Sequence, residues 1–283
     1  MSEYREQGLI FHSGNNRLVG VVAIPEHDAN VGVLIMVGGP QYRVGSHRQF
    51  TLLARDLTSA GFPSLRFDYS GMGDSEGDRL GFEKTGDDIS TAIDTFIECV
   101  PGITRVVLWG LCDAASSGMI LAHRDSRVKG MVLLNPWVHT GEYSPEVKLS
   151  HFYRPLFTEK DHWRRLFSGK IQLFPALKEL VQDTFALVGK LLPSVLPKHS
   201  QQHFIDEMLE GFQKFQYDVL IILSENDLTA KEFTTLVSRD KNWKSELQNP
   251  GIKVHTISGA DHTFSQRSAQ EEVSQMTIEW IGR

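Results

Sequence analysis

The stretch VVLWGLCDAAS, which runs from Val106 to Ser116, decides the fold of this chain. An apolar run of strand type meets small residues at a tight turn. The usual form of this pattern is G-x-S-x-G, a sharp strand-to-helix turn that exposes a nucleophile. Cys112 stands here in place of the serine, and Ala114 in place of the last glycine. Since free cysteines are among the most often buried residues, the turn alone fits a packed thiol as well as a nucleophile.

Apolar runs and helical patterns alternate on both sides of this turn. Runs that favour strands lie at 17–24, 31–37, 63–67, 106–109, 128–134, 219–223 and 252–257. Helical spacing occurs at 87–98 and 113–123, and Ser46 to Gln49 fits a capping box. Because the strand runs lack a polar face, they predict an α/β fold with a mostly parallel central sheet covered by helices on both faces.

The alternation stops after Asn135-Pro136, and the next buried run begins at Val219. The intervening stretch is rich in aromatic residues and has helical patterns. We therefore predict a core domain of residues 1–136 and 216–283, with a helical cap or lid inserted at 137–215. A dimer interface is the competing interpretation of the apolar insertion.

Composition narrows the class of protein. The chain has 283 residues, 41% of them hydrophobic, and a net charge of −6, which argues against a dedicated nucleic-acid binder. The N-terminus lacks an apolar signal segment and no stretch is long enough to span a bilayer, so we expect a soluble cytoplasmic protein. Cys99 and Cys112 are the only cysteines, so we do not expect a disulfide framework in this chain.

Polar groups follow the last two predicted strands. Asp227 comes just after the run at 219–223, and His262 just after the run at 252–257. Open α/β sheets build their sites at the carboxyl ends of strands. Nucleophile, acid and base therefore occur in the order Cys112, Asp227, His262, which is the α/β-hydrolase order.

From Val31 to its last helix the chain resembles the α/β-hydrolase superfamily. The motifs that carry this resemblance are the strand-to-helix turn at 106–116, called the elbow below, VGGP at 37–40, DYSGMGDS at 68–75 and GADH at 259–262. The second is similar to the H-G-x-P oxyanion loop and the third to D-x-R-G-x-G-x-S. Val37 and Ser70 depart from the usual histidine and arginine, which affects loop support more than mechanism.

A closer resemblance, carried by GGPQYRVGSHR at 38–48 and GLCDAAS at 110–116, is to exosortase A system-associated hydrolases of the first type. This bacterial family is found beside exopolysaccharide export genes. The resemblance implies a hydrolase fold, a cysteine in the nucleophile position and that genomic setting, but no substrate.

The residue types then indicate a mechanism. His262 is expected to take the Cys112 thiol proton and later to protonate the leaving group, while Asp227 orients the imidazole. Backbone N–H groups of Gly39 and Asp113 are expected to form the oxyanion hole. The Asp113 carboxylate is expected to act as a first-turn acid of its helix, and it would disfavour a thiolate if it pointed at the sulfur.

A cysteine nucleophile favours substrates with good leaving groups, such as esters, lactones and thioesters. We therefore predict a small-molecule carboxylic ester or thioester hydrolase with a covalent acyl-cysteine intermediate. An acyltransferase with the same triad and a non-catalytic scaffold are the rivals. Gln41, Tyr42 and Arg43 are candidates for substrate recognition. No metal, other cofactor or nucleic-acid partner is expected. A homodimer through the lid is an open alternative for the apolar insertion.

Overall fold

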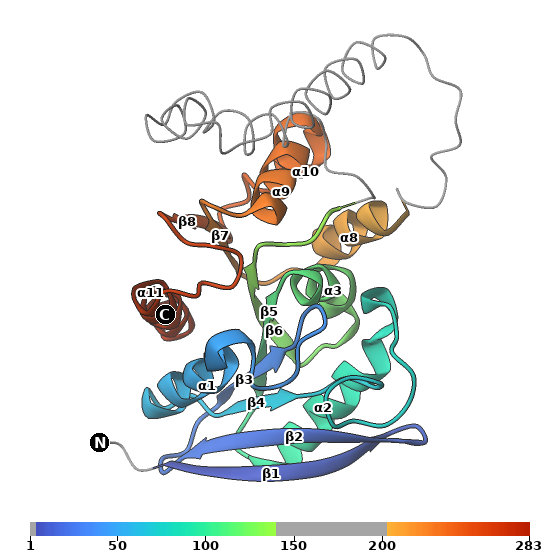
Figure 1. Ribbon diagram of the computed structural model, residues 1–283, viewed down its shortest axis with the longest axis vertical. Coiled ribbons are helices and arrows are strands. Elements are labelled where there is room, and N and C mark those ends of the chain that lie inside the picture. The colour runs from blue at the N-terminus through green and yellow to red at the C-terminus, as the bar shows by residue number, and fades with distance from the viewer. Residues whose placement is uncertain (1–3, 140–202) are drawn as a thin grey trace, which may run out of the picture. The chain divides into compact units, whose positions relative to one another are not determined.

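An eight-stranded sheet forms the centre of the computed structural model, which describes residues 4–139 and 203–283. Its strands are β1 (Tyr4–Ser13), β2 (Asn16–Pro25), β3 (Val31–Met36), β4 (Ser64–Phe67), β5 (Arg105–Leu111), β6 (Val128–Leu134), β7 (Val219–Ser224) and β8 (Ile252–Ile257). They lie in the order β1-β2-β4-β3-β5-β6-β7-β8 (Figure 1). β2 pairs antiparallel with β1 and β4, and all other neighbours are parallel. The predicted mostly parallel sheet is confirmed.

Helices cover both faces of this sheet. The α-helices are α1 (Gln49–Ser59), α2 (Gly86–Cys99), α3 (Asp113–Leu121), α8 (His203–Lys214), α9 (Leu228–Arg239), α10 (Lys241–Glu246) and α11 (Arg267–Ile281). Short 3₁₀ helices are η1 (Ser46–Arg48), η2 (Phe82–Lys84) and η3 (Ala122–Arg124). Residues of α1 and α11 pack on one face of the sheet, and residues of α2, α3 and α8 on the other (Figure 1).

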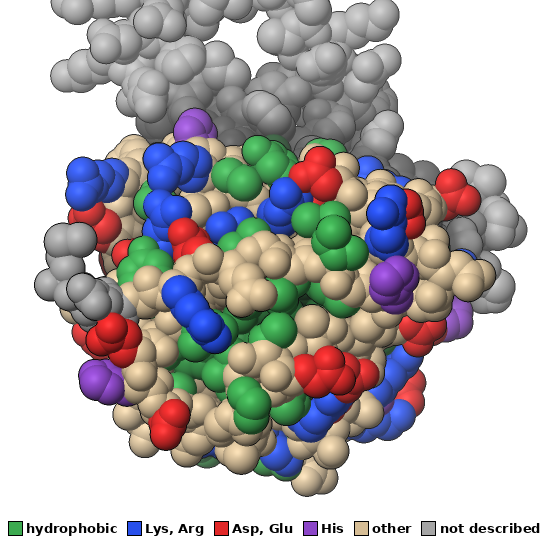
Figure 2. Space-filling view, turned by 90° about the horizontal axis from the view of Figure 1, so that it is seen from below, with side chains coloured by type: hydrophobic (Ala, Val, Ile, Leu, Met, Phe, Trp, Pro, Cys, Tyr) green, Lys and Arg blue, Asp and Glu red, His purple; other side chains and the backbone are tan. Residues whose placement is uncertain are grey.

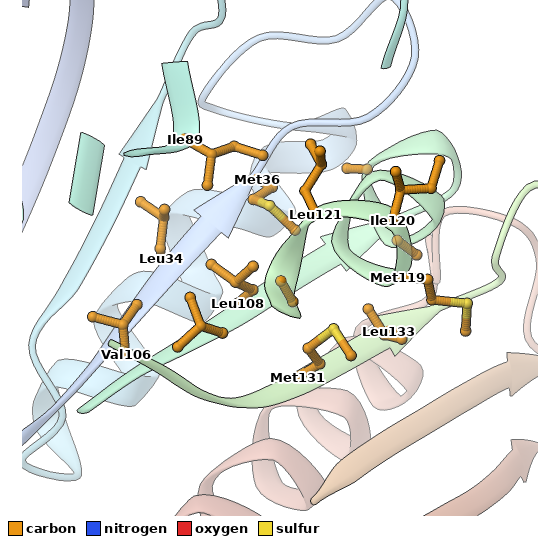
Figure 3. Close-up of a cluster of buried hydrophobic side chains, with 14 of the residues drawn as sticks. Leu34, Met36, Ile89, Val106, Leu108, Met119, Ile120, Leu121, Met131 and Leu133 are labelled. Carbon is orange, nitrogen blue, oxygen red and sulfur yellow. The ribbon is translucent and has the colours of Figure 1, made fainter. Parts of the chain in front are cut away.

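The side chains of the central strands alternate between two buried layers. In β3, Leu34 and Met36 point to the side of α2 and α3, whereas Val33 and Ile35 point to the side of α1 and α11. Figure 3 shows the first layer, where Met119 of α3 lies among the strand side chains. Because both faces are covered, a strand of this kind has no solvent-facing side, which explains its continuous apolar sequence.

The strand β1 is not indicated by the sequence pattern. Its residues 5–8 are exposed and mostly polar, and Ile10 is 67% exposed. β1 is one of the two edge strands of the sheet. Figure 2 views the molecule from the side of β1 and β2 and shows basic and acidic side chains interspersed rather than gathered into one patch. Charged side chains on an edge strand discourage pairing with other chains.

The predicted capping box at Ser46 is wrong. Helix α1 begins at Gln49, and no side chain caps it. His47 and Arg48 adopt left-handed backbone angles, with φ of 53° and 63°, so the chain turns into the helix too tightly for a capping box. The Ser46 N–H instead binds Oε1 of Gln41, at 3.0 Å.

The elements belong to one compact unit, formed by Met1–Val138 and Phe204–Arg283. The predicted cap or lid at 137–215 lies mostly outside the described residues, and its lid role stays a prediction. Its last part, α8, is described. Met208 and Phe212 of this helix are fully buried in the core layer on the α3 side, so α8 packs with the core.

Candidate active site

Cys112 lies at a strained turn between β5 and α3. Its φ of 64° and ψ of −125° place a non-glycine residue in a conformation that is uncommon outside functional sites. A Cβ at Gly110 would lie 2.8 Å from the backbone of Ala114, so only glycine lets β5 and α3 approach this closely. The Cys112 N–H donates to the carbonyl of Leu134 in the next strand, at 2.9 Å. The thiol is free and partly exposed.

Asp227 and His262 meet beside this turn. β7 and β8 are neighbouring parallel strands, so the loops that follow them lie at the same edge of the sheet. Nδ1 of His262 lies 3.0 Å from Oδ1 of Asp227, although its N–H is not well aligned with that oxygen. The other carboxylate oxygen of Asp227 accepts from the Ala230 N–H at 3.0 Å and caps α9, which fixes the acid.

The imidazole of His262 also interacts with the thiol of Cys112. Burial by itself would lower the pKa of His262. The hydrogen bonds and charges of Asp227 and Cys112 outweigh this effect and raise the pKa to about 10. The protonated imidazole of His262 is therefore favoured at neutral pH.

A buried polar network, which the sequence analysis missed, holds the acid and base loops together. Asn135 has no exposed surface and a φ of 44°. Its Nδ2 donates to Oγ of Ser224 at 2.9 Å and to the carbonyl of His262 at 3.1 Å. Oγ of Ser224 donates in turn to the carbonyl of Asp261, at 2.8 Å. The position of Asn135 directly after β6 was the available signal.

The predicted oxyanion residues Gly39 and Asp113 also lie together. A Cβ at Gly38 would lie 2.1 Å from the carbonyl oxygen of Leu111, so the glycine lets this loop touch the elbow. The Gly39 N–H donates to Oδ1 of Asp113, at 2.5 Å. Asp113 is a first-turn acid of α3, as expected, but its carboxylate reaches across to the oxyanion loop, which the sequence did not indicate.

The candidates for substrate recognition have partners within the chain. Arg43 pairs with Asp68, whose side chain is fully buried, and lies 2.7 Å from Asp74. Gln41 accepts from the N–H of Ser46. These bonds brace the loop, while Tyr42 is 46% exposed. Contact of these three residues with substrate stays a prediction.

Arg43 and Ser70 bind two different buried carboxylates. Ser70, which stands where the superfamily often has arginine, donates from its N–H and Oγ to Asp88, at 2.8 and 3.1 Å. The guanidinium beside Asp68 comes from the preceding loop instead.

Residues 4–139 and 203–283 hold no group of three or more His, Cys, Asp or Glu side chains arranged to bind a metal ion. Within the same ranges, no helix has the length and apolar character needed to cross a membrane.

The chain matches the model of the Alpha/beta hydrolase family over residues 34–276 and belongs to this family. Among curated proteins it is 30% identical to human Protein ABHD12B over 131 residues, which cover 45% of this chain and 35% of that protein. The chain thus matches only about a third of that relative's length.

Solved structures show the same fold. The esterase PF2001 of Pyrococcus furiosus has a TM-score of 0.65 at 14% identity, over 100% of this chain and 91% of that one. Dienelactone hydrolase from Anabaena variabilis has a TM-score of 0.61 at 14% identity, over 98% and 97%. Est1E from Butyrivibrio proteoclasticus, solved with ferulic acid, has a TM-score of 0.61 at 15% identity, over 97% and 100%.

Proposed function

We propose that this chain hydrolyses carboxylic esters or thioesters through a covalent acyl intermediate on Cys112. The observation that carries the proposal is the imidazole of His262, which interacts with both the Asp227 carboxylate and the Cys112 thiol. Membership of the hydrolase family and the likeness to proteins named as esterases support it. The strained elbow supplies the exposure that a nucleophile needs.

The acylation step follows from the charges of the triad. With His262 protonated, the Cys112 sulfur attacks the carbonyl carbon as a thiolate, and the carbonyl electrons move to the oxygen. The backbone N–H groups of Gly39 and Asp113 would stabilise this oxyanion. When the intermediate collapses, the alkoxide or thiolate leaves with the proton of His262.

Deacylation runs through the same groups. A water molecule gives a proton to His262 and attacks the acyl-thioester carbon. The second intermediate breaks its carbon–sulfur bond, releases the acid and restores the sulfur–imidazolium pair. Asp227 stabilises the imidazolium throughout. Thiolate leaves more easily than an unprotonated amine, so esters and thioesters are favoured over amides.

The setting of this activity rests on sequence. From the resemblance to exosortase A system-associated hydrolases we propose a role beside exopolysaccharide export. From the composition we propose a cytoplasmic protein. A homodimer formed through the insertion at 137–215 is likewise a proposal that rests on the sequence alone.

A burst assay with p-nitrophenyl acetate tests the proposal. Wild type should release a burst of p-nitrophenol, and Cys112→Ala should lose the burst and at least about a thousandfold in turnover. Cys99→Ala is the matched control, because burial raises the pKa of the Cys99 thiol and that residue lies at the end of α2. A wild type without a burst, with Cys112→Ala unchanged, favours a scaffold.

Product analysis separates hydrolysis from acyl transfer. In the presence of an added primary alcohol as acceptor, a hydrolase forms free acetate only. Transfer of the acetyl group to the alcohol at the expense of acetate would instead support the acyltransferase. Either result keeps Cys112 as the acylated residue.

A further inference from the structure

The carboxylate of Asp113 lies where the oxyanion of an acyl intermediate is expected. Its Oδ1 accepts the Gly39 N–H at 2.5 Å. The backbone N–H groups of Ala114 and of Asp113 itself also bind this carboxylate. Both amides assigned to the oxyanion hole therefore point at one internal anion. The hole is formed as an anion site at the start of α3, and a side chain of the protein fills it.

The surroundings of this carboxylate are partly buried. Burial raises the pKa of Asp113, while the amides of Gly39 and Ala114 and the charge of Arg79 oppose this rise. The charge of Asp113 adds to burial in raising the pKa of Tyr69. Cys112, which interacts with His262, directly precedes Asp113 in the chain.

Space is available for the carboxylate to move. A recess of about 20 Å³, lined in part by Tyr69, Arg79, Asp113 and Ser117, adjoins the oxyanion loop. This volume is about that of one water molecule. A rotation of the Asp113 side chain into it would free the Gly39 N–H without moving the backbone of the elbow.

We propose that the side chain of Asp113 is a gate of the oxyanion hole, which is closed while its carboxylate binds Gly39 and opens when the carboxylate leaves. This inference rests on the proposed function. A single N–H cannot serve the carboxylate and the substrate oxyanion fully at once, and the two negative charges repel each other. Acylation of Cys112 therefore requires the gate to open.

The gate acts on the transition state rather than on substrate binding. The neutral substrate carbonyl gains little from the hole, whereas the oxyanion depends on it. Removal of the gate should therefore raise kcat and leave KM nearly unchanged. Protonation of Asp113 should also loosen the gate, because a charged acceptor binds an N–H more strongly than a neutral one.

Asp113→Ala and Asp113→Asn test the gate with p-nitrophenyl acetate. Asp87→Asn is the matched control, because Asp87 is an exposed first-turn acid of α2. We expect Asp113→Ala to acylate about tenfold faster than wild type with an unchanged KM, since a charged competitor is gone. Asp113→Asn should show a smaller gain, and Asp87→Asn none. A folded Asp113→Ala that acylates no faster than wild type overturns the gate.

The burst assay distinguishes failure of the hydrolase proposal from failure of the gate proposal. A wild-type burst without acceleration in Asp113→Ala leaves the hydrolase standing and removes the gate. Absence of a burst from wild type and all variants removes both. A burst that appears only after Asp113 is replaced supports both.

A measurement on the wild type covers the case in which the variants do not fold. The amide proton of Gly39 should resonate downfield in an NMR spectrum, because it binds a charged carboxylate. Mild acid should move it upfield as Asp113 is protonated. A Gly39 amide that does not respond to acid while the protein stays folded overturns the gate.

Discussion

Nδ2 of Asn135 donates a hydrogen bond to the carbonyl oxygen of His262, 127 positions later in the sequence. The same side chain binds Ser224 through both its amide nitrogen and its oxygen. One buried amide thus links the end of β6 to the loops after β7 and β8. The orientation of the candidate base depends on a residue with no chemical role of its own.

Loss of this amide should cost stability and activity together. Asn135→Ala leaves buried partners unsatisfied, and we expect its free energy of unfolding to fall by about 1–3 kcal/mol, with lower kcat. Asn135→Gly separates the causes, because glycine tolerates the positive φ but makes no hydrogen bond. Urea unfolding of both variants gives the comparison. A stable and active Asn135→Gly would show that only the backbone conformation matters.

The pair of Arg43 and Asp68 should stabilise the loop far more than an exposed ion pair does. The Asp68 side chain is fully buried and that of Arg43 is 17% exposed. Arg43→Ala leaves a buried charge without its partner, which typically costs about 3–5 kcal/mol. Arg267→Ala breaks an exposed pair with Glu271 and should leave stability nearly unchanged. Equal losses in the two variants, measured by thermal unfolding, would contradict this account.

The contact between Asp227 and His262 predicts a pH dependence of stability. Burial opposes it, but Asp227 and Cys112 raise the pKa of His262 from 6.5 to about 10. A raised pKa contributes stability that is complete below the unfolded-state pKa and is lost as pH rises through the folded-state value. The difference in unfolding free energy between wild type and Asp227→Asn should therefore be largest just below pH 6.5 and shrink toward pH 10.

A second capping aspartate controls for the effect that an Asp→Asn substitution has on helix capping. Asp240 caps α10 through the N–H groups of Asn242 and Trp243, just as Asp227 caps α9. Asp240→Asn should change stability little, because asparagine also caps helices, and the difference should not vary between neutral and alkaline pH. If the difference in unfolding free energy between wild type and Asp227→Asn is equally independent of pH, His262 is not the group that titrates.

The approach of the oxyanion loop to the elbow should tolerate no side chain at Gly38. A Cβ there would lie 2.1 Å from the Leu111 carbonyl, and backbone cannot yield as a flexible side chain does. Gly38→Ala should lose activity and several degrees of melting temperature. Gly8→Ala, in β1, meets nothing within 4 Å and should match wild type. An active Gly38→Ala would show that the loop is free to shift.

Local patterns sufficed to predict the sheet and the meeting of three side chains. Apolar runs without a polar face indicated parallel strands, and parallel strands end at one edge, which places Asp227 near His262. The features of the site that the sequence did not predict are contacts between residues that are distant in sequence. Nothing in the letters around Asp113 indicates that its carboxylate turns to Gly39, 74 positions earlier, rather than to solvent. The edge strand β1 was missed because exposure removes the apolar signal.

The most direct test of the central claim is the site of acylation. After a brief reaction with p-nitrophenyl acetate, quenched in acid, peptide mass spectrometry should find an acetyl group on Cys112 and none on Cys99, the other cysteine of the chain. Cys112→Ala should carry no acetyl group at the same position. Burst release of p-nitrophenol without acetylation of Cys112 would contradict the account.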